Sequence, residues 1–119
     1  MLSVKEQKSV ERYLKSRKKA SMSLPHTKTL QVYSVAGVPF AYLETGKQLL
    51  RLSLRADSEL SRVLRERYEE VSPGQKLDPK VWNTIIISGQ LDLSEILALI
   101  DHSYILATQV AKDSKLPAS

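Results

Sequence analysis

The sequence contains no cysteine among its 119 residues. This absence excludes disulfide bonds, thiolate nucleophiles, iron–sulfur ligation and the common cysteine-based zinc sites. Glycine is also scarce. The four glycines are scattered at positions 37, 46, 74 and 89, so no glycine-rich loop precedes a helix to hold nucleotide phosphates. The two histidines lie far apart, and the acidic residues at 66, 69 and 70 stand among arginines, so we expect neither a metal nor a cofactor.

Long hydrophobic runs are missing as well. No apolar stretch approaches the ~20 residues of a membrane helix, and the basic start is not followed by the apolar segment of a signal peptide. We expect a cytoplasmic protein with no membrane association. A composition of 42% apolar and 26% charged residues is ordinary for a globular protein, and this length predicts one domain. We place that domain at residues 1–111 and a frayed tail at residues 112–119.

One group of residues suggests catalysis, because Asp101, His102 and Ser103 are consecutive. Neighbours on a helix point about 100° apart, so these three side chains cannot form a relay among themselves. The helical pattern places Asp101 and His102 on the wetted face and Ser103 on the apolar one. We therefore expect no catalytic residues and no enzyme.

The apolar pattern predicts an α+β fold. A helical period covers the first segment and ends near residues 21–23, ahead of Pro25. A period of two over residues 29–55 predicts three antiparallel strands in a meander, with Pro39 at a strand start or on an edge. A helix capped by Asp57 follows, then short strands at residues 75–77 and 82–88, then a final helix capped by Asp92. The result is a sheet of about five strands covered by N-terminal, mid-chain and C-terminal helices.

The charge excess is confined to one segment. The net charge is +5, and the first 19 residues hold seven basic and two acidic side chains, while the other hundred carry eleven of each sign. Three basic groups could contact a nucleic acid. They are the helical stripe Lys5, Lys8, Arg12, Lys15 and Lys19; Arg51 and Arg55 on the open sheet face, near Lys47; and Lys76 and Lys80, before Trp82 and Asn83. The alternative is that these lysines only solvate an outer helix face, and that Trp82 is a core residue rather than a base-stacking platform.

An ordered set of short motifs resembles the MmcQ/YjbR family. It comprises the strand from Arg51 to Arg55, the helix after Asp57, Pro73 with Gly74, and a signature formed by Trp82, Asn83, His102, Ser103 and Tyr104. The resemblance covers nearly the whole chain. It implies a CyaY-like α+β fold and a DNA-binding role through a double-wing motif, in which the hairpins would be the wings.

These observations lead to a functional hypothesis. We expect a small, non-enzymatic, monomeric protein that binds DNA or another nucleic acid through its phosphates, with little sequence specificity. The alternative is a protein-interaction or adaptor module that uses the open sheet face or an edge strand, with an acidic protein partner attracted to the first helix.

Overall fold

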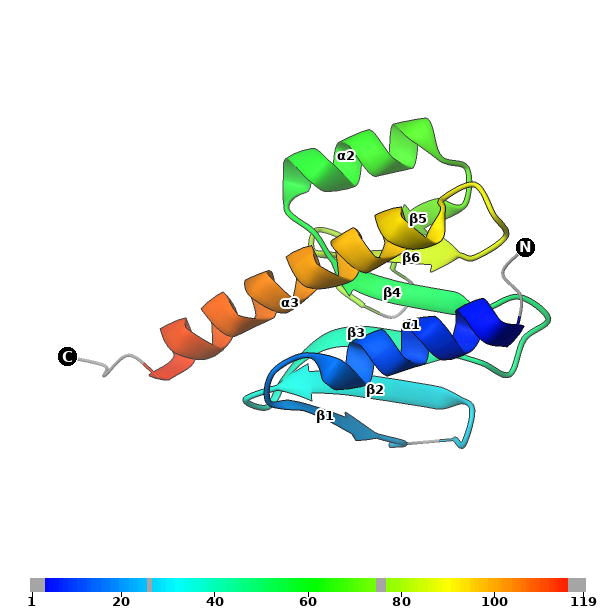
Figure 1. Cartoon of the computed structure of the whole chain (residues 1–119). Helices are drawn as coiled ribbons and strands as arrows, with labels where there is room; N and C mark the ends of the chain where they lie inside the picture. Colours follow the sequence, from blue (N-terminus) through cyan, green and yellow to red (C-terminus); the bar gives the residue numbers. More distant parts are fainter. Residues whose placement is uncertain (1–3, 26, 75–76, 116–119) are drawn as a thin grey trace.

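A single antiparallel sheet, covered on one face by helices, forms the body of the molecule (Figure 1). The structure is a computed structural model, and it describes residues 4–25, 27–74 and 77–115. The helices are α1 (Val4–Ser16), α2 (Ser58–Arg67) and α3 (Leu93–Lys115), and the strands are β1 (Ala20–Ser23), β2 (Leu30–Val35), β3 (Val38–Glu44), β4 (Arg51–Arg55), β5 (Val71–Pro73) and β6 (Trp82–Ile86). The strand order is β1-β2-β3-β4-β6-β5. The expected α+β fold is confirmed, with six strands in the described residues rather than about five.

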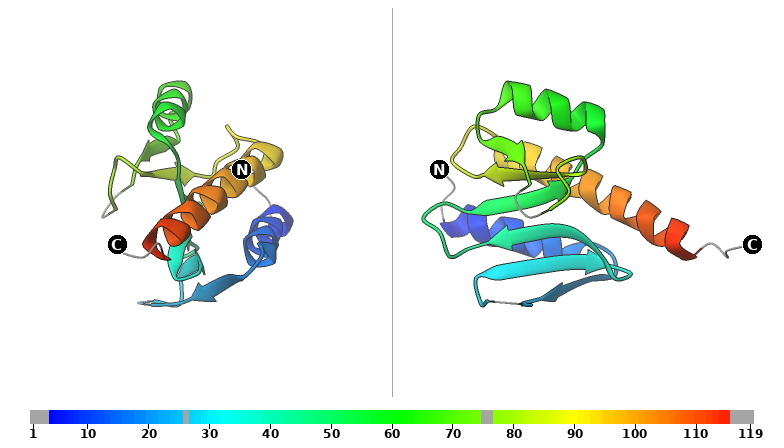
Figure 2. Two further views of the ribbon diagram at one scale, coloured as in Figure 1. Left: turned by 90° about the vertical axis from the view of Figure 1, so that its left-hand side faces the viewer. Right: turned by 180° about the vertical axis from the view of Figure 1, so that it is seen from behind.

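The helices and the sheet enclose one hydrophobic core. Side chains alternate along a strand, so Leu52 and Leu54 of β4 point into this core together with Val10 and Leu14 of α1. Seen from behind, the other face of the sheet carries neither α1 nor α3 (Figure 2). The interior position of β6, between β4 and β5, agrees with the expectation from its run of isoleucines. Pro39 lies at the start of β3, beside a bulge at Phe40 of the same strand, where a proline without an N–H is tolerated.

The N-terminal helix is shorter than the sequence pattern predicted. It ends at Ser16 instead of near residues 21–23, and β1 takes the place of its last part. Lys19 adopts a left-handed backbone conformation (φ 60°), which turns the chain so that β1 pairs antiparallel with β2. The apolar period could not reveal this reversal, because a lysine rarely adopts that conformation.

Three further boundaries differ from the prediction. The strand expected at residues 82–88 ends at Ile86. The short strand expected at residues 75–77 lies instead at Val71–Pro73; residues 75 and 76 are outside the described residues, and Leu77 is not in a strand. The last helix extends to Lys115, so the first residues assigned to a tail from Lys112 are helical. Both caps are as expected: Asp57 accepts from the Leu60 N–H at 2.8 Å, and Asp92 from the Glu95 N–H at 2.9 Å.

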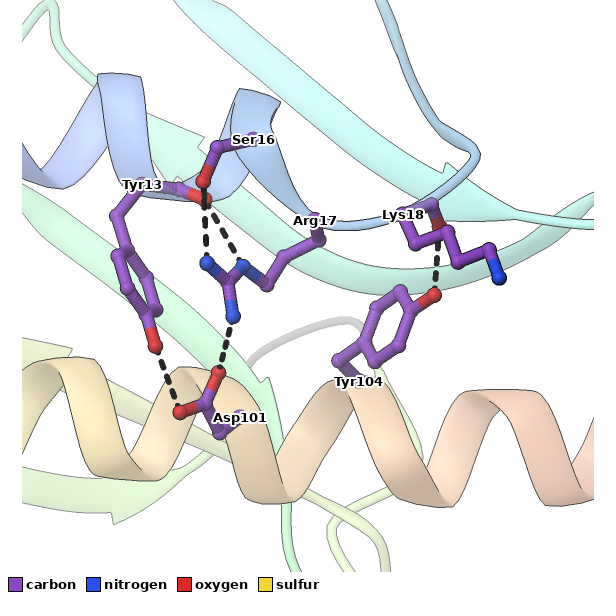
Figure 3. Close-up of polar contacts among 6 residues, drawn as sticks. All are labelled: Tyr13, Ser16, Arg17, Lys18, Asp101 and Tyr104. Carbon is purple, nitrogen blue, oxygen red and sulfur yellow. Dashed lines mark hydrogen bonds and ion pairs between the residues drawn. The ribbon is translucent and has the colours of Figure 1, made fainter.

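Three polar contacts hold α1 against α3 (Figure 3). The Tyr13 hydroxyl donates to Asp101 Oδ2 at 2.7 Å, and Arg17 Nη1 lies 2.9 Å from Asp101 Oδ1. The Arg17 guanidinium also lies 3.8 Å from the centre of the Tyr13 ring. One turn further along α3, the Tyr104 hydroxyl donates to the Lys18 carbonyl at 2.5 Å. These contacts fix the position of α1 relative to α3.

Replacing Asp101 with alanine should lower the free energy of unfolding by roughly 1–2 kcal/mol, because Tyr13 and Arg17 both lose their acceptor. Urea denaturation would measure the loss. Asp113→Ala, at an exposed acid of the same helix, is the matched control and should cost less than about 0.5 kcal/mol. Equal losses in the two variants would contradict the role assigned to Asp101.

A buried tyrosine should make the protein sensitive to alkaline pH. Tyr33 is fully buried, and desolvation, with the nearby charge of Glu11, raises its pKa to about 12. In the unfolded chain a tyrosine ionises near pH 10. The neutral form therefore contributes full stability below pH 10, and that contribution is lost as the pH rises to 12. Urea denaturation at several pH values should show that the free energy of unfolding falls less steeply above pH 10 in Tyr33→Phe than in the wild-type protein. Equal slopes in the two proteins would show that Tyr33 is not the cause of the alkaline sensitivity.

Candidate nucleic-acid interface

The first basic group lies on the outer side of α1. Lys8, Arg12 and Lys15 are exposed, whereas Val10 and Leu14 on the opposite side are fully buried. The side chain of Lys5, also in α1, is outside the described part of the structure. Lys19 does not continue the helical stripe, because α1 ends at Ser16; it is exposed on the turn that leads into β1.

Two exposed lysines extend the positive charge beyond the predicted stripe. Lys18 lies beside Lys19 at the end of α1, and Lys28 lies on the connection between β1 and β2. The sequence pattern did not single out either residue. The sequence feature that could have identified them is a segment without acidic residues, because no Asp or Glu occurs between Glu11 and Glu44. This segment forms the second half of α1, β1, β2 and most of β3. The strands β1 and β2 at one edge of the sheet therefore carry no carboxylate side chain.

Arg17 belongs to the same segment but does not add free charge. Its guanidinium is ion-paired with Asp101 at 2.9 Å, and its Nε donates to the Tyr13 carbonyl at 3.3 Å. Arg17 therefore stabilises the helix pair rather than offering its charge to a ligand.

The second basic group lies on the opposite face of the sheet. Arg51 and Arg55 alternate with the core residues of β4, so the sheet separates them from the outer side of α1. Arg55 donates from Nε to the Pro39 carbonyl at 2.7 Å, and its guanidinium lies 4.7 Å from the centre of the Trp82 ring. Burial lowers the pKa of Arg55 from its ordinary value, while the neighbouring Tyr42 raises it by a smaller amount. The Arg51 Nε is buried with no hydrogen-bond partner among the described residues.

Trp82 is buried on this face, with 6% of the residue exposed. Tyr42 contacts it edge to face, with the ring centres 5.1 Å apart. Gly74 approaches from the side, so closely that an added Cβ would lie 2.9 Å from the Trp82 Cβ. Trp82 therefore offers no open ring face on which a base could stack.

Of the third basic group, Lys76 and Lys80, the structure describes only Lys80. Lys80 is exposed beside α2, and Lys76 lies outside the described residues. Asn83 is 2% exposed and presents no amide to a ligand. It accepts from Arg65 Nε at 2.7 Å and donates from Nδ2 to the Ser61 hydroxyl at 2.8 Å. The three basic groups thus occupy three separate parts of the molecule.

Ser103 joins α3 to the sheet at the point where β3 and β4 separate. The direct ladder between these strands ends at the pair Ala41 and Leu54. At the next position the buried Ser103 hydroxyl accepts from the Arg55 N–H at 2.8 Å and donates to the Phe40 carbonyl at 2.5 Å. The serine side chain therefore bridges two backbone groups that would otherwise be buried without partners.

The residues beside Ser103 have structural contacts too. His102 Nε2 lies 3.4 Å from Asp57 Oδ2 but is not aligned for a hydrogen bond, so this contact is an ion pair only when His102 is protonated. Tyr104 packs edge to face on Phe40, with the ring centres 5.4 Å apart. All five residues of the signature, Trp82, Asn83, His102, Ser103 and Tyr104, thus contact other parts of the same chain.

Comparison with known proteins identifies the family. A model of the YjbR family matches residues 15–106. The chain belongs to the YjbR family. It is 31% identical over 81 residues to the uncharacterized protein YjbR of Escherichia coli strain K12, covering 68% of this chain and 69% of that relative. The resemblance read from the signature is confirmed.

Two solved structures share the fold of this YjbR-family chain. One is the Deinococcus radiodurans protein DR2400, described as a DUF419 domain, with a TM-score of 0.82 and 23% identity over 95% of this chain and 90% of that one. The other is a protein from Pseudomonas syringae, with a TM-score of 0.72 and 20% identity over 85% of this chain and 97% of that one. Both likenesses concern the fold alone.

The described residues lack two further features. None of the helices there is both long and apolar enough to cross a membrane. The same residues contain no group of three His, Cys, Asp or Glu side chains placed to hold a metal ion.

Ser103→Ala should lower the free energy of unfolding by about 1–3 kcal/mol, because the Arg55 N–H and the Phe40 carbonyl both lose their buried partner. Thr108→Ala removes another hydroxyl of α3, which donates to the Ile105 carbonyl of the same helix at 2.6 Å, and should change stability by less than about 0.5 kcal/mol. Thermal and urea unfolding of both variants would measure the difference. An unchanged Ser103→Ala variant would show that the bridge contributes nothing.

Proposed function

We propose that this protein is a non-enzymatic nucleic-acid-binding protein that contacts phosphates through α1 and the turn after it. We call this region the basic α1 surface, and it consists of Lys8, Arg12, Lys15, Lys18 and Lys19. All five side chains are exposed, and none forms an ion pair within the described part of the chain. This concentration of uncompensated charge is the observation that supports the proposal. Lys28, on the connection between β1 and β2, adds a further exposed cation.

The geometry of α1 suits a phosphate backbone. A helix rises 1.5 Å per residue, so Lys8 and Lys15 are about 10 Å apart along one side of α1, with Arg12 between them. Each phosphate that such a side chain neutralises releases counterions, which makes binding favourable and dependent on salt. The basic α1 surface consists of cations and contains no Asn or Gln, whose side-chain amides recognise adenine by two hydrogen bonds. We therefore expect little sequence preference.

The absence of catalysis is part of the proposal. Asp101, His102 and Ser103 come closest to a set of hydrolase residues in the sequence. Ser103 is fully buried between two backbone groups, and Asp101 is engaged by Tyr13 and Arg17. Their hydrogen-bonding capacity is used within the fold, which favours a binding protein over an enzyme.

The triple variant Lys8→Glu, Arg12→Glu, Lys15→Glu should bind duplex DNA about 100-fold more weakly than wild type, because three phosphate contacts become repulsive. Fluorescence anisotropy at two salt concentrations would measure the affinity. The wild-type protein should also bind more weakly as the salt concentration rises. In a plot of log K against log salt concentration, the slope should be roughly −1 for each phosphate contacted. The melting temperature should stay within a few degrees, since all three side chains are exposed.

The matched control reverses three exposed lysines elsewhere, Lys47→Glu, Lys80→Glu and Lys112→Glu, and so changes the net charge by the same amount. It should retain most of the affinity. Equal loss in both triple variants would show that net charge alone governs binding. Failure of the wild-type protein to bind at low salt, or binding without a salt dependence, would refute the proposal.

A second candidate function rests on the free edge of β1. This strand is terminal in the sheet, and Met22 and Leu24 beside its edge are 40% and 48% exposed. A partner's extended segment could add to the strand by backbone hydrogen bonds, and acidic side chains on it would be attracted by Lys18 and Lys19. A partner that remains bound in a pull-down after nuclease treatment would favour this adaptor role. Met22→Pro should then abolish capture of that partner without affecting DNA binding.

A further inference from the structure

A hollow beside α2 lies apart from the basic α1 surface. Its volume is about 440 Å³, and its lining residues are Ser58, Ser61, Arg62, Arg65, Glu66, Pro79 and Lys80. We call it the α2 hollow. Helix α2 packs near β5, at the opposite edge of the sheet from β1 (Figure 1). A hollow of this size falls within the range of small-molecule sites.

The guanidinium of Arg65 is fixed in the wall of this hollow by neutral acceptors. Its Nε donates to Asn83 Oδ1 at 2.7 Å, and its Nη2 donates to the Pro79 carbonyl at 2.6 Å and the Trp82 carbonyl at 3.3 Å. Asn83 is itself oriented by its bond to Ser61, so the orientation of Arg65 is set before any ligand arrives. No carboxylate in the described residues forms an ion pair with Arg65, and its Nη1 has no protein partner among them.

The charged residues that line the hollow are three cations, Arg62, Arg65 and Lys80, and one carboxylate, Glu66. Arg62 lies between two carboxylates of its own helix, Glu59 at 2.5 Å and Glu66 at 3.3 Å, and its charge is shared by both. Lys80 is exposed and forms no ion pair within the described residues. Arg65 and Lys80 are thus the two cations of the lining that form no ion pair among the described residues, one on α2 and one on the loop before β6. The Asp78 carboxylate of that loop accepts from the Lys80 backbone N–H at 3.0 Å.

We propose that the α2 hollow binds the phosphate group of a small phosphate monoester. A monoester carries close to two negative charges at neutral pH, which matches the two free cations. The Nη1 hydrogens of Arg65 and the ammonium group of Lys80 donate to the phosphate oxygens, with the hydroxyl of Ser58 in the same lining. A volume of about 440 Å³ exceeds that of a phosphate alone and leaves space for the organic part of the ligand.

The test titrates the full chain with inorganic phosphate at constant ionic strength and follows the backbone amides by NMR. Saturable shifts confined to α2 and to residues 78–83 are expected. Lys80→Ala should weaken phosphate binding about threefold to tenfold, and Arg65→Lys about tenfold or more, since lysine cannot keep the fixed fork. Lys47→Ala, at an exposed lysine outside the hollow, should bind phosphate as wild type does.

Three results would overturn the proposal. Shifts that spread over the molecule without saturating would mean that phosphate only screens charge. Unchanged affinity in Lys80→Ala, a variant at an exposed side chain that should fold normally, would exclude the hollow as the site. Equal binding of phosphoserine and of a dinucleotide diester would mean that the hollow recognises nucleic-acid backbone and not a monoester. The triple α1 variant should bind phosphate normally, so the proposed function and this site can fail separately.

Discussion

The contacts of one turn of α3 connect this helix to the sheet, to the end of α1 and to the start of α2. Ser103 supplies the link between β3 and β4, while Asp101 and Tyr104 hold the end of α1 and His102 approaches the cap of α2. Successive residues on a helix point about 100° apart, so Asp101, His102 and Ser103 reach different elements, while Tyr104, three positions after Asp101, returns to the side of α1. The geometry that prevents Asp101, His102 and Ser103 from forming a catalytic relay is therefore the geometry that makes this turn the attachment point of the fold.

Periodicity and capping residues were sufficient to predict most of the fold, because they depend on local chemistry. The helix after Asp57, the meander and the last helix all follow from patterns that a single segment carries. The end of α1 could not be predicted in this way, since Lys19 adopts a left-handed conformation that its residue type does not favour. The strand at Val71–Pro73 is too short to show a period, and its pairing with β6 depends on a contact distant in sequence.

The candidate site was less predictable than the fold, because the charge available at a surface depends on tertiary partners. Arg17 looks like any other base of the first segment, yet its ion pair with Asp101 joins residues far apart in the chain. Arg55 was expected on an open face, but Trp82 and the Pro39 carbonyl hold it half-buried. The signature residues serve these internal contacts, so family membership predicts the scaffold, while the exposed lysines of α1 and the α2 hollow carry the chemistry proposed for binding.

The two proposed binding surfaces lie on different parts of the molecule, since α1 packs against β1 and α3 whereas α2 packs near β5, and this spacing limits how they can influence each other. Strands in a sheet are about 4.8 Å apart, so the five intervals from β1 to β5 amount to roughly 24 Å. The Debye length at physiological ionic strength is about 8 Å, which means that an anion in the α2 hollow has little direct electrostatic effect on α1. Any coupling between the surfaces would have to be mechanical. The route that the structure offers for it is α3, which contacts α1 through Asp101 and Tyr104 and the start of α2 through His102.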